Sequence, residues 1–118
     1  MKLWHDNERC PPDESWTWVR TNAQAIAYLR AHEVAEISLD HDLGVDPRDP
    51  DLDFVAGRSE HDGSGLDLVE AMCAEALVPP RVTIHSWNAD GAEKMAARLH
   101  YSGYDCMIRP YEEPPAVW

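Results

Sequence analysis

Acids and histidines gather at three places where an apolar, strand-like segment of the sequence ends. Asp6 follows the first such segment, Asp40-His41-Asp42 follows the third, and His85-Ser86-Trp87-Asn88 follows the fourth. Histidines titrate near neutral pH and can act as base and acid. Carboxylates can fix a histidine's tautomer or bind Mg²⁺. Because chance would not usually place such residues at three matching strand ends, the pattern predicts an acid–base or metal site.

Other residues in these segments could hold a phosphate and its substituents. Arg9 can bind phosphate through its planar guanidinium, and Trp87 can stack on a nucleobase. We predict the following sets: catalytic residues His41, His85, Asp40 and Asp42, and substrate-binding residues Arg9, Ser86, Trp87 and Asn88. Two roles for the acids stay open. Either Asp40 or Asp42 orients a histidine, or Asp6, Asp40 and Asp42 bind Mg²⁺.

Simpler roles compete with each of these assignments. Asp42-Leu43-Gly44 has the composition of a turn, and Arg9 could pair on the surface with Glu8 or Asp13. Ser86, Asn88 or Asp90 could cap the following helix. His5, which lies inside the first strand-like segment, is expected to be structural.

Strands and helices must alternate to position these residues. The patterns predict strands at 2–5, 16–20, 36–40, 82–85 and 106–109 and helices at 23–32, 66–77 and 90–100. Such alternation indicates an α/β fold with a mostly parallel sheet. Ligands of such sheets bind beyond the carboxyl ends of the strands, where the candidate residues stand.

The length of 118 residues predicts one domain, spanning residues 1–118. Residues 44–63 hold Pro47, Pro50 and six acids without hydrophobic periodicity, which predicts a long acidic loop. The formal net charge of −12 argues against passive wrapping of nucleic acid, which requires a basic surface, and we expect no double-stranded nucleic acid as a partner. It does not exclude an enzyme that acts on a single nucleotide.

The redox compartment and membrane association follow from the cysteines and the apolar runs. The three cysteines, at 10, 73 and 106, form no CxxC motif, which favours a reduced, cytoplasmic protein. No apolar run approaches the roughly 20 residues that span a bilayer, so we expect no membrane association.

Four motifs together resemble one known family. They are LWHDNERCPP (3–12), ISLDHDLG (37–44), SGLDLVEAM (64–72) and IHSWNADGAEKM (84–95). The chain is similar to the cyclic-phosphate-processing receiver domains, although Asn7 stands where that family tends to carry a second acid. The resemblance implies a receiver-like (flavodoxin-like) five-stranded sheet of order 2-1-3-4-5 that lacks the first and last receiver helices. It also implies a phosphoesterase acting on cyclic phosphates of nucleotides or RNA ends.

Two other classes of function stay open. One is a non-catalytic receiver-like module that binds phosphate or metal and acts through a protein partner, with phosphorylation of Asp40 as a variant. The other is a pure interaction protein, favoured if the histidines are buried and inert. The two missing receiver helices share one sheet face, which must be covered by the 44–63 loop, the Trp16/Trp18 pair, the Trp118 tail or a second copy. We expect a homodimer built on that face.

Overall fold

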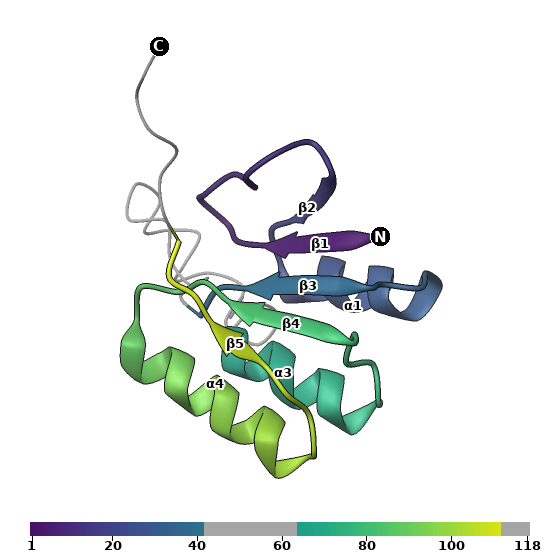
Figure 1. The fold of residues 1–118 in the computed structure, drawn as a ribbon. Helices are drawn as coiled ribbons and strands as arrows, with labels where there is room; N and C mark the ends of the chain where they lie inside the picture. The colour runs from purple at the N-terminus through teal and green to yellow at the C-terminus, as the bar shows by residue number, and fades with distance from the viewer. Residues whose placement is uncertain (42–63, 112–118) are drawn as a thin grey trace, which may run out of the picture.

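The computed structural model describes residues 1–41 and 64–111. Within them the strands are β1 (Lys2–His5), β2 (Trp16–Val19), β3 (Glu36–Leu39), β4 (Arg81–Ile84) and β5 (Met107–Ile108). The helices are α1 (Asn22–Ala31), α3 (Gly65–Ala74) and α4 (Ala89–Tyr101). All strand pairs are parallel and the order is β2-β1-β3-β4-β5, as Figure 1 shows. The predicted fold and strand order are confirmed.

Each helix begins at a capping side chain. Thr21 accepts a hydrogen bond from the N–H three residues further on. Ser64 and Asp67 form a reciprocal capping box, and the Asn88 side chain accepts from the N–H of Gly91. These bonds satisfy N–H groups that have no partner within the helix.

The end of α3 departs from the sequence prediction. The helix ends at Ala74, three residues before the predicted Leu77. Ala76 adopts a left-handed backbone with φ of 54°, which a continuing helix does not allow. At the end of α4, Gly103 takes a left-handed φ of 88° just beyond the helix, as its position predicts.

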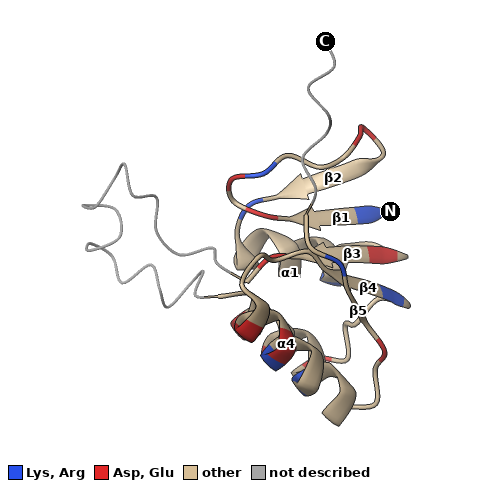
Figure 2. Cartoon of the chain, turned by 60° about the vertical axis from the view of Figure 1, so that its left-hand side comes forward, with Lys and Arg blue, Asp and Glu red and all other residues tan. Residues whose placement is uncertain are grey.

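The three helices form one layer on one face of the sheet. Helix α3 packs against both α1 and α4 (Figures 1 and 2). Every second strand residue points into this layer, and these residues, together with apolar side chains of the helices, form the core: Leu3, Val19, Ile37, Leu39, Val82 and Ile84. None of these helices is long and apolar enough to cross a membrane.

The connection between β1 and β2 is unusually short for a parallel pair, which normally needs a crossover helix. Two tryptophan side chains hold it in place. Trp18 Nε1 donates to the Asp6 carbonyl at 2.6 Å, and Trp4 Nε1 donates to the Arg9 carbonyl at 2.7 Å. Both indoles therefore fix the turn from the face of the sheet on which residues 1–41 and 64–111 place no helix, called the helix-free face below.

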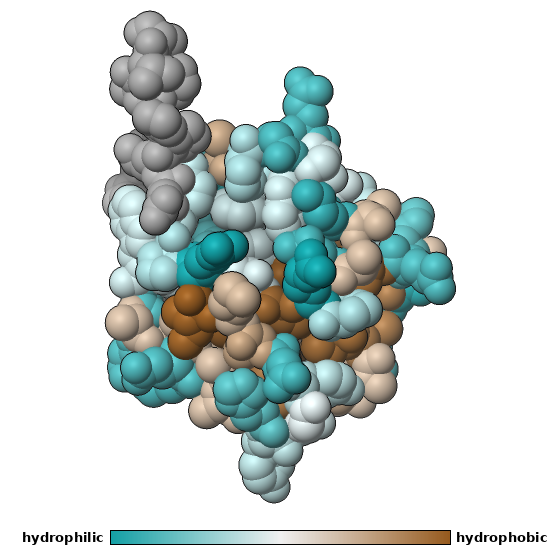
Figure 3. All heavy atoms as spheres, viewed as in Figure 1, coloured by the Kyte–Doolittle hydropathy of each residue, from teal (hydrophilic) through white to brown (hydrophobic). Residues whose placement is uncertain are grey.

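That helix-free face is partly covered by the chain's own side chains. Trp4 and Ser38 lie on it and are buried, and Trp4 contacts Trp16 at 5.6 Å and Tyr111 at 5.8 Å between ring centroids. Figure 3 shows apolar surface where Figure 1 places β4 and β5. On β5, Met107 is level with Thr83 on the helix-free face and is exposed. The homodimer stays a prediction, and the 44–63 loop and Trp118 lie outside the described residues.

Candidate functional site

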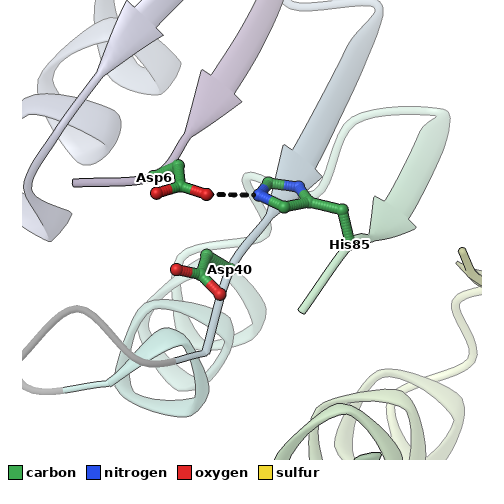
Figure 4. Close-up of side chains that lie close together, drawn as sticks. All are labelled: Asp6, Asp40 and His85. Atoms are coloured by element: carbon green, nitrogen blue, oxygen red, sulfur yellow. Dashed lines mark hydrogen bonds and ion pairs between the residues drawn. The ribbon is translucent and has the colours of Figure 1, made fainter. Parts of the chain in front are cut away.

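Asp6, Asp40 and His85 each follow a strand by one residue, and the register brings them side by side. The ladder continues one step past the strands, since Asp40 N donates to His5 O at 3.1 Å and His85 N donates to Leu39 O at 2.8 Å. The pleat turns all three side chains to the helix-free face. They converge there, buried, with one ligand atom of each within 4.8 Å of the others (Figure 4).

The imidazole of His85 is held on three sides. Its Nε2 lies 3.0 Å from Asp6 Oδ2, its Nδ1 lies 2.7 Å from Ser38 Oγ, and the Trp4 indole stacks on it at 4.0 Å with an interplanar angle of 5°. Because a carboxylate only accepts, a neutral ring donates from Nε2 to Asp6 and accepts at Nδ1 from the Ser38 hydroxyl. The ring tautomer is thereby fixed.

The carboxylate that orients His85 is Asp6, whereas the sequence analysis named Asp40 or Asp42 for this role. Asp40 stands between the two partners on β3, and the His85 side chain reaches past it to Asp6 on β1. The histidine and its carboxylate therefore come from β1 and β4, which are not neighbouring strands, so strand adjacency does not predict this pair. Asp42 lies outside the described residues.

Ser38 is a site residue that the sequence analysis missed. The linkage from Ser38 through His85 to Asp6 has the connectivity of a nucleophilic triad. However, Ser38 is in the middle of β3 and only 2% exposed, so it positions the ring and does not attack a substrate. The available signal was a single hydroxyl in an otherwise apolar strand end, two residues before an acid.

The two carboxyl groups of the site have opposite pKa shifts. Burial raises the pKa of Asp6, but hydrogen bonds from His85 and from the N–H groups of Arg9 and Glu8 outweigh it and hold the pKa below its usual value. Burial, followed by the negative charge of Asp6, raises the pKa of Asp40. When the pKa values of two neighbouring carboxyl groups separate in this way, one group can act as an ionised partner and the other as an acid.

Arg9 connects this cluster to an exposed aromatic residue. Its Nη1 lies 3.8 Å from Asp6 Oδ2, is buried, and makes no hydrogen bond within the described part of the chain. Its guanidinium carbon lies 4.0 Å from the ring centroid of Trp87, whose Nε1 donates to the Tyr111 carbonyl at 2.7 Å. The ion pair of Arg9 is thus with Asp6, not with Glu8 or Asp13.

The remaining predicted residues lie around the start of α4. His41 N donates to Asp40 Oδ1 at 2.8 Å, and the His41 ring packs against Gly91 with its Nδ1 3.4 Å from Asn88 Nδ2. Ser86 Oγ accepts from the Asn88 N–H, while Asn88 is the N-cap of α4. His41 is not part of the close cluster, and the substrate-binding roles of Ser86 and Asn88 stay predictions.

Asp6, Asp40 and His85 are also the group best placed to hold a divalent cation in the described residues. Mg²⁺ prefers oxygen ligands. The two oxygens of Asp6 already accept three protein hydrogen bonds, two at Oδ1 and one at Oδ2. A carboxylate has about four acceptor sites, so Oδ2 can still bind a cation. The residues fit Mg²⁺ through the carboxylates of Asp6 and Asp40.

His5 is structural, as expected, and faces the helix side. It is fully buried with Nε2 2.8 Å from Asn22 Oδ1. Burial is the main cause that lowers its pKa from 6.5 to about 4; the nearby charge of His85 adds to the lowering, while Asn22 and Asp6 oppose it.

We expect the lowered pKa of His5 to make the fold acid-sensitive. Between pH 6.5 and about 4 the unfolded chain binds a proton that the folded chain excludes, so stability is complete above that window and is lost as the pH falls. From pH 7 to pH 5 this group should remove ~2 kcal/mol from the free energy of unfolding. Urea titrations measure it, and His5→Gln should show a smaller loss. An equal loss in both proteins would contradict the assignment.

A comparison with protein-family models matches residues 1–101 to the cyclic-phosphate processing receiver domain. A comparison with curated proteins finds no match. The matched span contains every strand end that contributes to the Asp6–Asp40–His85 cluster.

Proposed function

The chain belongs to the family of cyclic-phosphate processing receiver domains, and from this premise we propose that it is a phosphoesterase that opens cyclic phosphates of nucleotides or RNA ends. The observation that carries the proposal is the cluster of Asp6, Asp40 and His85, in which the two carboxyl groups have opposite pKa shifts. A structural ion pair alone does not require a second, protonatable carboxyl beside it.

Opening a cyclic phosphodiester by water needs a proton acceptor and a proton donor. The water oxygen bonds to phosphorus, one phosphorus–oxygen ester bond breaks, and the leaving sugar oxygen takes a proton. His85 takes up the proton of the water at Nδ1, and the Ser38 hydroxyl then turns to accept from that nitrogen instead of donating to it. Asp6, bonded to Nε2, stabilises the imidazolium that forms. Asp40, whose raised pKa favours the protonated form, gives a proton to the leaving oxygen.

The phosphate charge needs a cation, and Arg9 supplies it. Its guanidinium already lies beside Asp6 and has a buried N–H group that no hydrogen bond engages in the described residues. A bound phosphate oxygen would satisfy this group through a charge-assisted hydrogen bond. Asp6 and Asp40 would hold Mg²⁺ if it binds, and the ion would then add positive charge at the phosphate.

A second candidate function is a non-catalytic module that binds phosphate and acts through a partner. The observation that favours it is the burial of all three cluster side chains, together with the hydrogen bonds at both ring nitrogens of His85. Under this alternative the cluster holds the strand ends together, and Arg9 alone meets the ligand.

Turnover distinguishes these two functions. We expect the protein to convert 2′,3′-cyclic nucleotides to phosphate monoesters, which phosphorus NMR resolves from the cyclic ester. The reaction is run once with a chelator and once with Mg²⁺, so that the need for a metal is read from the same spectra. Binding without conversion under both conditions would favour the non-catalytic module.

We expect Arg9→Lys to lower kcat/KM for a 2′,3′-cyclic nucleotide by about 10- to 100-fold. Lysine keeps the charge but loses the planar fork, and a hydrogen bond to a charged group contributes roughly 1.5–3 kcal/mol. Arg20→Lys is the matched control, because Arg20 also stacks on an indole, that of Trp18, at 4.1 Å. Equal losses in the two variants would show that stacking, not phosphate binding, is what Arg9 contributes.

A further inference from the structure

We infer that Trp87 binds the nucleobase of the ligand by stacking, and that the ligand is a free cyclic mononucleotide. The inference rests on the proposed function, because it takes the ligand to be a cyclic phosphate. Its evidence is a separate set of contacts, those of the Trp87 side chain. Trp87 is 57% exposed, although it lies only two positions after His85, which is buried. The indole of Trp87 is therefore not part of the hydrophobic core.

The Trp87 ring is nevertheless held in a fixed orientation. Its Nε1 donates to the Tyr111 carbonyl, and Arg9 covers one of its faces. The exposed fraction must therefore lie on the opposite face and the ring edges. A ring that is already immobilised loses little conformational freedom when a flat ligand stacks on it.

Arg9 and Trp87 lie next to each other at the edge of the cluster. Arg9 lies between the carboxylate of Asp6, at 3.8 Å, and the Trp87 ring, at 4.0 Å. A phosphate on the buried N–H of Arg9 is thus next to the acid–base cluster, and the attached base can reach the outer face of the indole. One small ligand would use both contacts.

The distribution of charge disfavours a longer RNA. The net charge is −12, and several basic residues elsewhere are paired with acids: Arg30 with Glu75, Arg81 with Glu36, and Arg98 with Glu70. Figure 2 shows both acidic and basic residues on α4, where Lys94 is paired with Asp90 at 3.4 Å. Successive phosphates of a polynucleotide need a series of unpaired cations along their path. A mononucleotide needs only one, and Arg9, although it is ion-paired with Asp6, has an N–H group that makes no hydrogen bond in the described residues.

Calorimetric binding tests the inference without requiring turnover. Three ligands are compared in a His85→Ala background, so that none is consumed: adenosine 2′,3′-cyclic phosphate, glycerol 1,2-cyclic phosphate, which has no base, and a short oligoribonucleotide ending in a 2′,3′-cyclic phosphate. We expect Trp87→Ala to weaken binding of the nucleotide by roughly 5- to 150-fold. The base-free ester should bind weakly and equally with either residue, and the oligonucleotide should bind no tighter than the nucleotide at physiological salt.

Two further variants exclude a purely structural effect of Trp87. Trp87→Phe keeps an aromatic face but loses the N–H bond to Tyr111, and it should retain most of the affinity for the nucleotide. Tyr101→Ala removes an exposed aromatic residue at the other end of α4 and should change nothing. Equal weakening of both small ligands by Trp87→Ala, or tighter binding of the oligonucleotide, would overturn the inference. Base-dependent binding by a wild-type protein that shows no turnover would support the subsite and reject the phosphoesterase.

Discussion

Replacing His85 with alanine should lower the turnover of a 2′,3′-cyclic nucleotide by roughly 10²- to 10⁴-fold, the usual contribution of a general acid–base group. In this variant Asp6 loses the imidazole N–H that donates a hydrogen bond to it, and the site loses the ring that takes up the proton of the water. Steady-state rates followed by phosphorus NMR or by chromatography of the monoester measure the loss. Arg9 and Trp87 are untouched, so we expect kcat to fall much more than KM rises.

The control for this variant is His32→Ala. His32 is the exposed C-cap of α1, and its ring lies beside that of Tyr28, so we expect its loss to leave kcat unchanged. Thermal unfolding of both variants shows whether the space left beneath Trp4 has destabilised the fold. A folded His85→Ala protein with wild-type kcat would remove His85 from the reaction and leave it as a buried core histidine.

Replacing Gly65 with alanine should displace Asp40, although Gly65 is not itself a residue of the cluster but the first residue of α3. A Cβ at this position would lie 1.9 Å from the carbonyl oxygen of Asp40, so α3 or the end of β3 must move. Overpacking of this kind costs about 1–3 kcal/mol, and occasionally more. Because Asp40 itself moves, we also expect kcat to fall by about 10²-fold, the effect of a shift of about 1 Å in a reacting group.

Gly103→Ala is the matched control for that variant. Gly103 has a left-handed φ of 88° and no atom within 4 Å of its would-be Cβ. Alanine there should cost roughly 1 kcal/mol through backbone strain and leave kcat unchanged. Urea titration and steady-state rates on both variants separate the two effects. A Gly65→Ala protein with wild-type stability and kcat would show that α3 does not fix Asp40.

The sequence was sufficient to predict the parts of the fold and site that depend on local pattern. Alternating strand and helix segments predict a parallel sheet, and the polar residues after the strands mark where Asp6, Asp40 and His85 stand. The resemblance to a known family added the strand order. These predictions succeed because the strands are short and mostly apolar and are followed by polar residues, so their ends are visible in the sequence.

The pairing of side chains within the site was not predictable from pattern. The histidine bonds to Asp6 across an intervening strand because its ring is long enough to pass Asp40, and Ser38 holds the other nitrogen from beneath. The supporting roles of Trp4 and Trp18 were also missed. Both bonds end on backbone carbonyls of a loop whose path depends on tertiary contacts.

The most direct measurement is turnover of a 2′,3′-cyclic nucleotide in water enriched in the heavy isotope of oxygen, followed by mass spectrometry of the product. If water attacks phosphorus at the cluster of Asp6, Asp40 and His85, the wild-type protein should form a monoester that carries one heavy oxygen on its phosphate. His85→Ala should form little of it in the same time. A cyclic nucleotide that stays intact with the wild-type protein, with or without Mg²⁺, would contradict the proposed phosphoesterase.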